Sequence, residues 1–192
     1  MTPFLTGILK AIQSIFKPKP TFMRDKITRD RVALLHPKVR QEVEACIVKA
    51  EAGFPPNMAI RVVQGLRTID EQNAIYAQGR TTPGKIVTNA RGGKSYHNYG
   101  LAIDFSIMFD KDGNGTWETL SWDTSSDADH DTVKDWQEVV RVFEASGWIW
   151  GGKFSTIVDM PHLQKTFGYK IAELLRMYEA KIFMPGTKYI EL

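Results

Sequence analysis

The chain has 192 residues, of which 43% are hydrophobic and 24% are charged, as expected for one globular domain with a sizeable core. Its net charge of +3 is too small to identify a nucleic-acid-binding protein, and we expect no nucleic acid as a partner. The single cysteine excludes an internal disulfide bond, and no stretch reaches the roughly 18 apolar residues of a membrane-spanning helix.

Residues 1–21 are predicted to form an arm and a linker, separate from a main domain at residues 22–192. The arm carries an apolar stripe at helical spacing: Phe4, Leu5, Ile8, Leu9, Ile12, Ile15 and Phe16. A stiff Lys-Pro-Lys-Pro spacer follows at residues 17–20. No basic segment precedes the stripe and no small-residue cleavage site follows it, so we expect no cleavable signal peptide. Two interpretations stay open: a helix packed on the domain, or an amphipathic arm lying on a membrane surface.

The first half of the main domain is expected to contain two helices and one strand. A helix is predicted from Pro37 to about residue 52, and Cys46 on its apolar side is interpreted as a small buried hydrophobic residue. The Ile- and Val-rich residues 59–66 predict a strand. Arg67 follows that strand directly, and a capping box from Thr68 to Glu71 opens a second helix that ends near Gln78.

A long loop and a strand occupy the middle of the chain. Residues 80–100 are rich in Gly, Thr, Asn and Lys and are predicted to be a loop, the kind of segment that often carries function. The strand at residues 101–109 alternates, with Leu101, Ile103, Phe105, Ile107 and Phe109 on one face. Asp104 lies on the other face between the small residues Ala102 and Ser106, which leave room for a metal ion. A carboxylate in mid-strand requires a partner.

The remaining segments predict further mixed elements. Residues 110–116 form a glycine-rich hairpin turn that leads into a short strand at residues 117–120. A capping-box-like start at Thr132 opens a helix that ends at Gly147, residues 148–150 and 157–164 are closing strands, and a last helix covers about residues 169–181. Helices and strands do not alternate regularly. We therefore predict an α+β fold with a small central antiparallel sheet flanked by helices.

Two short segments supply the groups of a catalytic zinc site. His97 ends the long loop, and Gly100 lets the backbone bend so that His97 and Asp104 can meet. His162 follows a proline, and Asp159 lies three residues before it. Two imidazoles and one carboxylate are three protein ligands for zinc, and the spare carboxylate is suitable as a base beside the open position. We predict one Zn²⁺ per chain.

Two other segments partly match metal-binding patterns, and we interpret both as ordinary turns or loops. Asp110, Asp112 and Asn114 match the first half of a calcium-binding loop, but Ser121 stands where the bidentate glutamate should be, so a plain hairpin turn is favoured over calcium. His130 lies among acidic residues in the segment 123–131, which we interpret as a hydrated loop rather than a metal site.

The combined motif resembles a known family. Ser-x-His-x-x-Gly-x-Ala-x-Asp at residues 95–104, followed by Asp-x-Pro-His at residues 159–162, is similar to the zinc peptidases. These include VanY-type D-alanyl-D-alanine carboxypeptidases, VanX-type dipeptidases and the L-alanyl-D-glutamate endopeptidases of phage endolysins. The resemblance covers about residues 35–164, including the arginine segment at 65–72 and Trp-Ile-Trp-Gly-Gly at 148–152. It implies the zinc D,D-peptidase (Hedgehog/DD-peptidase-like) fold and makes residues 22–192 the catalytic domain.

The resemblance also implies a role for each site residue. His97, Asp104 and His162 become the zinc ligands, Asp159 the general base, and Arg67 the group that stabilises the carbonyl oxygen or oxyanion. Each role agrees with general chemistry, since a carboxylate can move the proton of water and a guanidinium can neutralise a developing charge. Ser95, Tyr96 and Trp150 are weaker candidates for substrate binding, since aromatic residues are more often in the core.

The function that the resemblance favours is hydrolysis of the L-Ala–D-Glu bond in the peptidoglycan stem peptide by an endolysin. A D-alanyl-D-alanine carboxypeptidase or dipeptidase is the alternative with the same chemistry. A catalytically inactive cell-wall-binding domain is the alternative of another class, and the intact ligand set and Asp159 argue against it. We expect a monomer that is made in the host cytoplasm and acts on the cell wall, with membrane contact through residues 1–21 as an open interpretation.

Overall fold

The computed structural model describes residues 22–155 and 157–192. The predicted N-terminal arm lies outside the described residues, and both interpretations of its apolar stripe stay predictions. The fold is α+β, as the sequence predicts. Within the described part of the chain, no helix combines the length and the apolar character needed to cross a bilayer.

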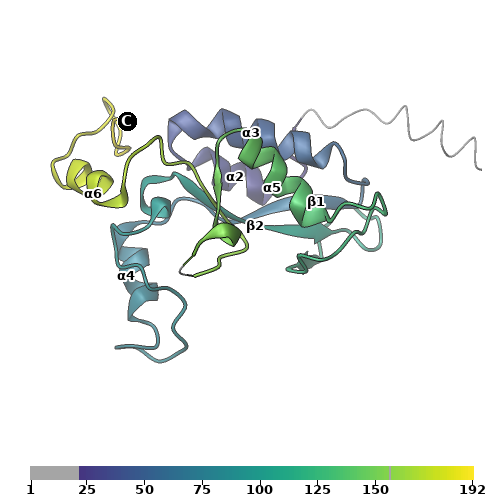
Figure 1. Cartoon of the computed structure of the whole chain (residues 1–192), viewed down its shortest axis with the longest axis horizontal. Helices are drawn as coiled ribbons and strands as arrows, with labels where there is room; N and C mark the ends of the chain where they lie inside the picture. Colours follow the sequence, from purple (N-terminus) through teal and green to yellow (C-terminus); the bar gives the residue numbers. More distant parts are fainter. Residues whose placement is uncertain (1–21, 156) are drawn as a thin grey trace, which may run out of the picture.

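A small antiparallel sheet forms the centre of the domain (Figure 1). Its strands are β1 (Met58–Gln64), β2 (Ala102–Phe109), β3 (Thr119–Ser121), β4 (Ile149–Trp150) and β5 (His162–Gln164). The order is β1-β2-β5-β4, and β3 pairs with β2 at its far end. The register places Asp104 of β2 opposite His162 of β5, so the sheet itself brings two predicted ligands together.

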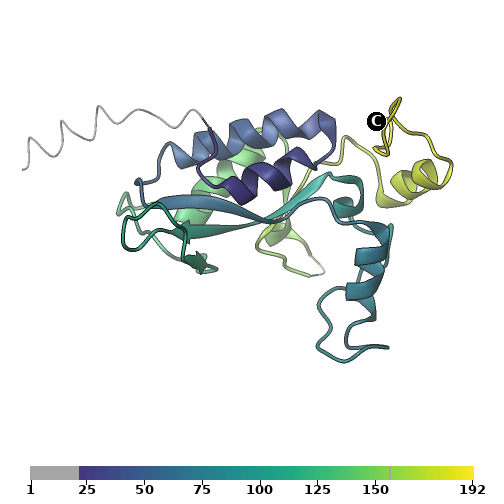
Figure 2. The ribbon, with the colours of Figure 1, turned by 180° about the vertical axis from the view of Figure 1, so that it is seen from behind.

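Three helices lie together along one face of the sheet, and both views show them there (Figures 1 and 2). They are α2 (Lys26–Ala33), α3 (Pro37–Glu51) and α5 (Asp135–Ala145). Two further helices, α4 (Ile69–Ala77) and α6 (Ile171–Glu179), lie at the end of the molecule that also carries the C-terminus. The short 3-10 helices η1 (Tyr96–Tyr99) and η2 (Gly151–Lys153) connect strands beside the predicted site.

The core lies between these three helices and the sheet. On α3 the buried side chains repeat at helical spacing, which confirms the buried state of Cys46: Val39, Val43, Cys46, Ile47 and Ala50. On β2, Ile103, Phe105 and Ile107 are almost fully buried, and the Phe105 ring packs 4.5 Å from that of Trp136 on α5. Burial of this apolar surface is the main force that fixes the register of the central strand.

Some element boundaries differ from the predictions. The capping box predicted at Thr132 is wrong: α5 begins at Asp135 after Lys134, and Thr132 adopts a φ of 77°. The strand predicted at residues 157–164 is shortened to β5, because the amide of Asp159 donates to the carbonyl of Gly151 at 3.0 Å instead of continuing a strand. Helix α2 has no counterpart among the predicted elements.

Candidate active site

The predicted ligands His97, Asp104 and His162 meet at one point. Nε2 of His97 lies 3.1 Å from Oδ1 of Asp104, and Nδ1 of His162 lies 3.0 Å from the same oxygen. The two imidazole nitrogens are 3.2 Å apart. Gly100 ends η1 with a left-handed φ of 67°, which turns the chain from His97 into β2. The three ligand atoms therefore form a nearly equilateral triangle.

The outer nitrogen of each imidazole is held by an acceptor. Nδ1 of His97 lies 2.8 Å from the carbonyl of Gly65, and Nε2 of His162 lies 3.0 Å from Oε1 of Gln164. Because an oxygen acceptor requires a proton on these nitrogens, the inner nitrogens carry lone pairs in the neutral rings. Two lone pairs and a carboxylate oxygen then face one another, and a cation between them satisfies all three.

The triangle fits zinc in donor type and in size. Ligand atoms 2.0–2.1 Å from a tetrahedral zinc stand roughly 3.3 Å apart, close to the separations of this site. Two nitrogens and one oxygen are a donor set that zinc accepts, and three protein ligands leave a fourth position for water or substrate. His97, Asp104 and His162 are therefore the residues that would hold the metal.

The imidazoles favour the ionised form of Asp104, and Asp104 in turn favours the protonated form of His162. Burial alone would raise the pKa of Asp104, but His97 and His162 outweigh it and hold that pKa well below its usual range. Burial alone would lower the pKa of His162, but the hydrogen bond and the charge of Asp104 raise it above its usual value. Asp104 thus stays ionised, as a metal ligand must.

Asp159 is the spare carboxylate of the site. Burial, followed by the charge of Asp104, raises its pKa. Its backbone is fixed on both sides, since its amide donates to Gly151 at 3.0 Å and its carbonyl accepts from the amide of His162 at 3.2 Å. Gly151 is needed there, because a Cβ at that position would lie 2.4 Å from the carbonyl oxygen of Asp159.

Arg67 enters the site after β1, separated from the strand by Gly65 and Leu66. Its amide donates to the carbonyl of His97 at 3.0 Å, and its Nη1 donates to Oε1 of Gln72 at 3.0 Å. Gln72 is fully buried and is itself fixed by a hydrogen bond to the carbonyl of Ala90 at 2.8 Å. Burial lowers the pKa of Arg67, and the charges of Asp104, Glu71 and Asp159 oppose that shift. The guanidinium is thus oriented by a buried amide and faces two site carboxylates.

An open cavity of about 610 Å³ surrounds these groups. It is lined by the three metal ligands together with Arg67, Lys94, Ser95, Tyr96, Phe154, Asp159 and Gln164, among others. Ser95 caps η1 by accepting from the amide of His97 at 3.3 Å, and the hydroxyl of Tyr96 donates to the carbonyl of Tyr169 at 2.7 Å. Both candidate substrate-binding residues therefore line the cavity, and both also shape its wall.

Trp150, the third candidate for substrate binding, does not line this cavity. Its side chain is buried, and its indole nitrogen donates to the carbonyl of Met160 at 2.7 Å. The structure therefore gives Trp150 a different place, in the core, where it holds the segment between Asp159 and His162.

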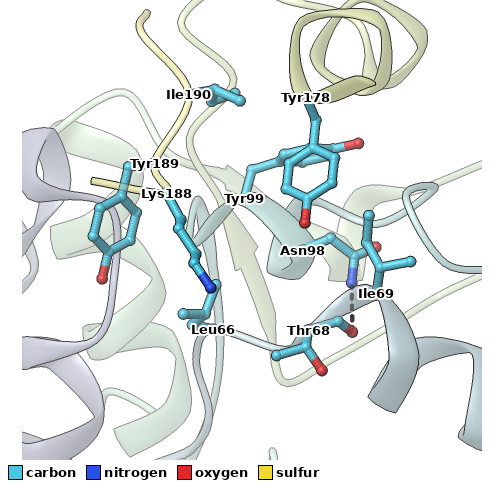
Figure 3. Close-up of a pocket in the computed structure, with 9 residues that line it drawn as sticks. All are labelled: Leu66, Thr68, Ile69, Asn98, Tyr99, Tyr178, Lys188, Tyr189 and Ile190. Atoms are coloured by element: carbon cyan, nitrogen blue, oxygen red, sulfur yellow. Dashed lines mark hydrogen bonds between the residues drawn. The ribbon is translucent and has the colours of Figure 1, made fainter. Parts of the chain in front are cut away.

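A second pocket of about 290 Å³ lies beside η1 (Figure 3). It is lined by Leu66, Thr68, Ile69, Asn98, Tyr99, Tyr178, Lys188, Tyr189 and Ile190. None of the metal ligands faces it, and its Asn98 amide donates to the carbonyl of Arg67 at 3.0 Å. We therefore assign the chemistry to the larger cavity.

Several residues of the larger cavity and its immediate support were not predicted from the sequence, among them Gln72, Lys94, Phe154 and Gln164. Gln164 lies two residues after His162, and the period of a strand could have placed both on one face. Gln72 lies in the first turn after the Thr68 capping box, where its side chain returns toward Arg67. Phe154 packs 5.9 Å from the His162 ring, and no sequence pattern indicates that contact.

The turn after β2 is a hairpin, as predicted, because β2 pairs with β3. Asp110 is buried and accepts from the amides of Gly113, Asn114 and Gly115 at 2.8, 3.2 and 2.8 Å. Its carboxylate is therefore satisfied by the turn itself. Calcium at Asp110, Asp112 and Asn114 stays the less favoured prediction.

Two imidazoles, a ligand carboxylate, a spare carboxylate and a guanidinium in one open cavity define a metallopeptidase centre. Comparison with known proteins agrees. A family model described as D-alanyl-D-alanine carboxypeptidase, of the M15 peptidases, matches residues 88–165. The peptidoglycan L-alanyl-D-glutamate endopeptidase CwlK of Bacillus subtilis (strain 168) is 46% identical over 132 residues, which are 68% of this chain and 72% of CwlK.

The chain belongs to the VanY-like M15 family of zinc-dependent metallopeptidases. The crystal structure of the L-Ala D-Glu endopeptidase ChiX of Serratia marcescens matches with a TM-score of 0.46 and 21% sequence identity, over 74% of this chain and 88% of ChiX.

Proposed function

We propose that this enzyme is an endopeptidase that hydrolyses the L-Ala–D-Glu bond of the peptidoglycan stem peptide. The observation that carries the chemistry is the convergence of His97, Asp104 and His162, with Asp159 and Arg67 facing the same cavity. The choice of bond is supported by CwlK, which shares 46% identity across most of its own length.

Zinc, when bound, lowers the pKa of water to about 7 and polarises the carbonyl that is attacked. Asp159 then acts as the general base: its carboxylate takes a proton from the attacking water and returns it to the leaving amine. Its raised pKa suits this role, because a stronger base accepts the proton more readily and a protonated carboxyl can still donate. Gly151 and His162 hold its backbone in place on either side.

Arg67 stabilises the charge that develops on the carbonyl oxygen. Its guanidinium donates from a fixed direction, because Gln72 holds one of its nitrogens. A preorganised donor in a partly buried cavity stabilises the transition state more than an exposed, mobile one would.

The carboxypeptidase alternative is favoured by two observations. The family model that matches residues 88–165 is described as a D-alanyl-D-alanine carboxypeptidase, and the exposed Lys94 at the cavity could bind a terminal carboxylate. Under this alternative, Lys94→Met raises KM for a peptide with a free C-terminus much more than for the same peptide with an amidated C-terminus. For an endopeptidase, Lys94→Met changes KM relative to the wild type by the same factor with both peptides.

Mass spectrometry of digested peptidoglycan distinguishes the two activities. The endopeptidase leaves fragments with a new N-terminal D-Glu, whereas the carboxypeptidase releases D-Ala. We expect new N-terminal D-Glu from the zinc-loaded enzyme and none from Asp159→Ala, with Asp30→Asn as a matched surface control that retains full activity. Release of D-Ala as the main product overturns the proposal, and so does full activity of the Asp159→Ala enzyme.

We further propose that the enzyme is a monomer that is made in the cytoplasm of a host and acts on the cell wall. Residues 1–21 are proposed to contact the membrane surface through their apolar stripe and lysines. The test is deletion of residues 1–20: we expect weaker binding to anionic vesicles and an unchanged rate on isolated peptidoglycan. Unchanged vesicle binding removes the proposed contact.

A further inference from the structure

Residues 127–138, which span the end of the loop after β3 and the first turn of α5, carry five carboxylates. They are Asp127, Asp129, Asp131, Asp135 and Glu138. In a 12-residue calcium-binding loop, side-chain ligands stand at positions 1, 3, 5 and 9, and a bidentate glutamate stands at position 12. With Asp127 at position 1, all five carboxylates of this loop fall on those positions. The acidic residues of the segment 123–131 alone are typical of a hydrated loop, but the spacing extends into the helix that follows.

The fold brings the five carboxylates together. Ligand oxygens of Asp127, Asp129 and Asp135 lie within 4.8 Å of one another, and so do those of Asp129, Asp131 and Glu138. Asp129 belongs to both groups, so the two groups form one cluster. Asp135 has no exposed surface, and both of its carboxylate oxygens accept from the amide of Ala128 at 3.1 Å.

A separate observation points to a missing ligand at Glu138. Its Oε2 is enclosed by protein atoms and has no hydrogen-bond partner, the one such side-chain atom in the described residues. Burial, followed by the charges of Asp129, Asp131, Asp135 and Asp127, raises the pKa of Glu138 to about 7. An enclosed oxygen without a partner destabilises the fold, and a cation on that oxygen removes the cost.

We propose that residues 127–138 bind one Ca²⁺ ion through the carboxylates of Asp127, Asp129, Asp131, Asp135 and Glu138. All the side-chain ligands are oxygens, which calcium prefers and zinc does not, and their number suits calcium's six to eight ligands. The seventh position, which supplies a backbone carbonyl in such loops, is Val133. The sixth position, glycine in such loops, is Thr132, and its left-handed φ of 77° is the conformation for which glycine is used there.

The turn at residues 110–121 offers a natural comparison. It has Asp110, Asp112 and Asn114 at the first, third and fifth positions, but Ser121 at the twelfth. The bidentate ligand is absent there, and no enclosed oxygen of that turn lacks a partner among the described residues. Asp112→Asn is therefore the matched control for loss of one acidic charge from a turn of the same kind.

A cation in this loop would also stabilise the beginning of α5. Asp135 and Glu138 lie in the first turn of that helix, and Trp136 between them donates from its indole to the carbonyl of Met160 at 3.3 Å. Met160 lies between Asp159 and His162. The loop is thus linked through one buried side chain to the segment that carries the proposed base.

Calorimetric titration of the zinc-loaded full chain with CaCl₂ tests the site. We expect one saturable calcium site, unchanged in Asp112→Asn and weakened roughly 100-fold in Glu138→Gln, since the twelfth position supplies two of the ligand oxygens. Asp131→Asn, at an exposed position, is expected to weaken binding without affecting the fold. Absence of calcium binding overturns the proposal, as does loss of binding in Asp112→Asn with full binding in Glu138→Gln.

Thermal unfolding gives a second, independent measurement. At a calcium concentration that saturates the wild type but lies well below the weakened Kd of Glu138→Gln, calcium is expected to raise the Tm of the wild-type chain and to change that of Glu138→Gln little. Without calcium, Glu138→Gln should be at least as stable as the wild type, since it removes one charge from a crowded acidic cluster. Two results together would contradict the site: Glu138→Gln is clearly less stable than the wild type without calcium, and calcium does not raise the Tm of the wild type. Glu138 would then have a structural role only.

Discussion

Nε2 of His162 lies 3.0 Å from Oε1 of Gln164, two residues along the same strand. This hydrogen bond leaves Nδ1 of His162 free to face Asp104 and so fixes which nitrogen would bind a metal. The carbonyl of Gly65 does the same for His97 from the opposite side. The ligand geometry therefore depends on two acceptors that are not ligands themselves.

Gln164→Leu is predicted to weaken zinc binding. Loss of the acceptor lets the His162 ring rotate and change tautomer, and such changes typically reduce metal affinity by about 10- to 100-fold. Competition with a chromophoric chelator measures the affinity. Gln164→Glu keeps an acceptor at the same place and should bind zinc about as tightly as the wild type. Equal affinities for the Leu and Glu variants would show that the hydrogen bond does not orient the ligand.

Gly151→Ala is predicted to inactivate the enzyme. A Cβ at this position would lie 2.4 Å from the carbonyl oxygen of Asp159 and 2.9 Å from Cβ of His162, so both residues must move. A displacement of about 1 Å in a catalytic group can reduce the rate about 100-fold. The rate on isolated peptidoglycan checks this prediction.

Gly186→Ala is the control for that variant. Gly186 has a φ of 70° and nothing within 4 Å of an added Cβ, so the substitution strains the backbone locally but reaches no site residue. It should lower the Tm and keep kcat. Comparable activity in the Gly151 and Gly186 variants would mean that the close approach to Asp159 is not needed for catalysis.

Arg67→Met is predicted to lower kcat by about 100- to 1,000-fold, the usual effect of removing one oxyanion donor. Gln72→Leu should lower kcat by less, because it leaves the guanidinium in place but removes the partner at 3.0 Å that orients it. The two substitutions together should cost little more than Arg67→Met alone, since Gln72 acts through Arg67. Steady-state kinetics of the three variants provide the check, and additive losses would separate Gln72 from Arg67.

The sequence predicts that His97 and Asp104 meet because the signals for both are local. The alternation of β2 gives Asp104 a face of the strand, and the left-handed Gly100 turns the chain at His97. What joins them to His162 is the β2–β5 register, a long-range pairing that the periodicity of the sequence does not contain.

The features that could not be predicted from the sequence depend on tertiary contacts. Trp150 is a weak candidate for substrate binding from its sequence, and its burial against Met160 is decided by packing between β4 and the loop before β5. Thr132 has the pattern of a helix cap, yet its backbone adopts a left-handed φ and its amide donates to Asp127 of the acidic loop. The spacing of five carboxylates across residues 127–138 was present in the sequence and crosses the boundary between the loop and α5.

The contribution of Glu138 to the stability of the calcium-free chain is predicted to fall as pH rises toward neutrality. Glu138 has a folded-state pKa raised from 4.5 to about 7, by burial and by Asp129, Asp131, Asp135 and Asp127. The folded chain therefore binds a proton more tightly than the unfolded chain, so ionisation costs stability between pH 4.5 and 7 and the cost is complete above that range. Urea unfolding at several pH values, compared with Glu138→Gln, measures the effect.

The difference in unfolding free energy between the two proteins should shift in favour of Glu138→Gln as pH rises, and added calcium should reverse it. A difference that stays constant from pH 4.5 to 8 would show that the Glu138 carboxyl is not perturbed by its neighbours.

The zinc content of the purified chain, measured by plasma mass spectrometry, tests the central claim most directly. The triangle of His97, Asp104 and His162 predicts one zinc per wild-type chain. It also predicts near loss of zinc in a folded His97→Gln variant, whose amide cannot reproduce the imidazole nitrogen that lies 3.1 Å from Asp104. A wild-type chain without zinc, or a folded His97→Gln chain with full zinc content, would contradict the assignment of this site.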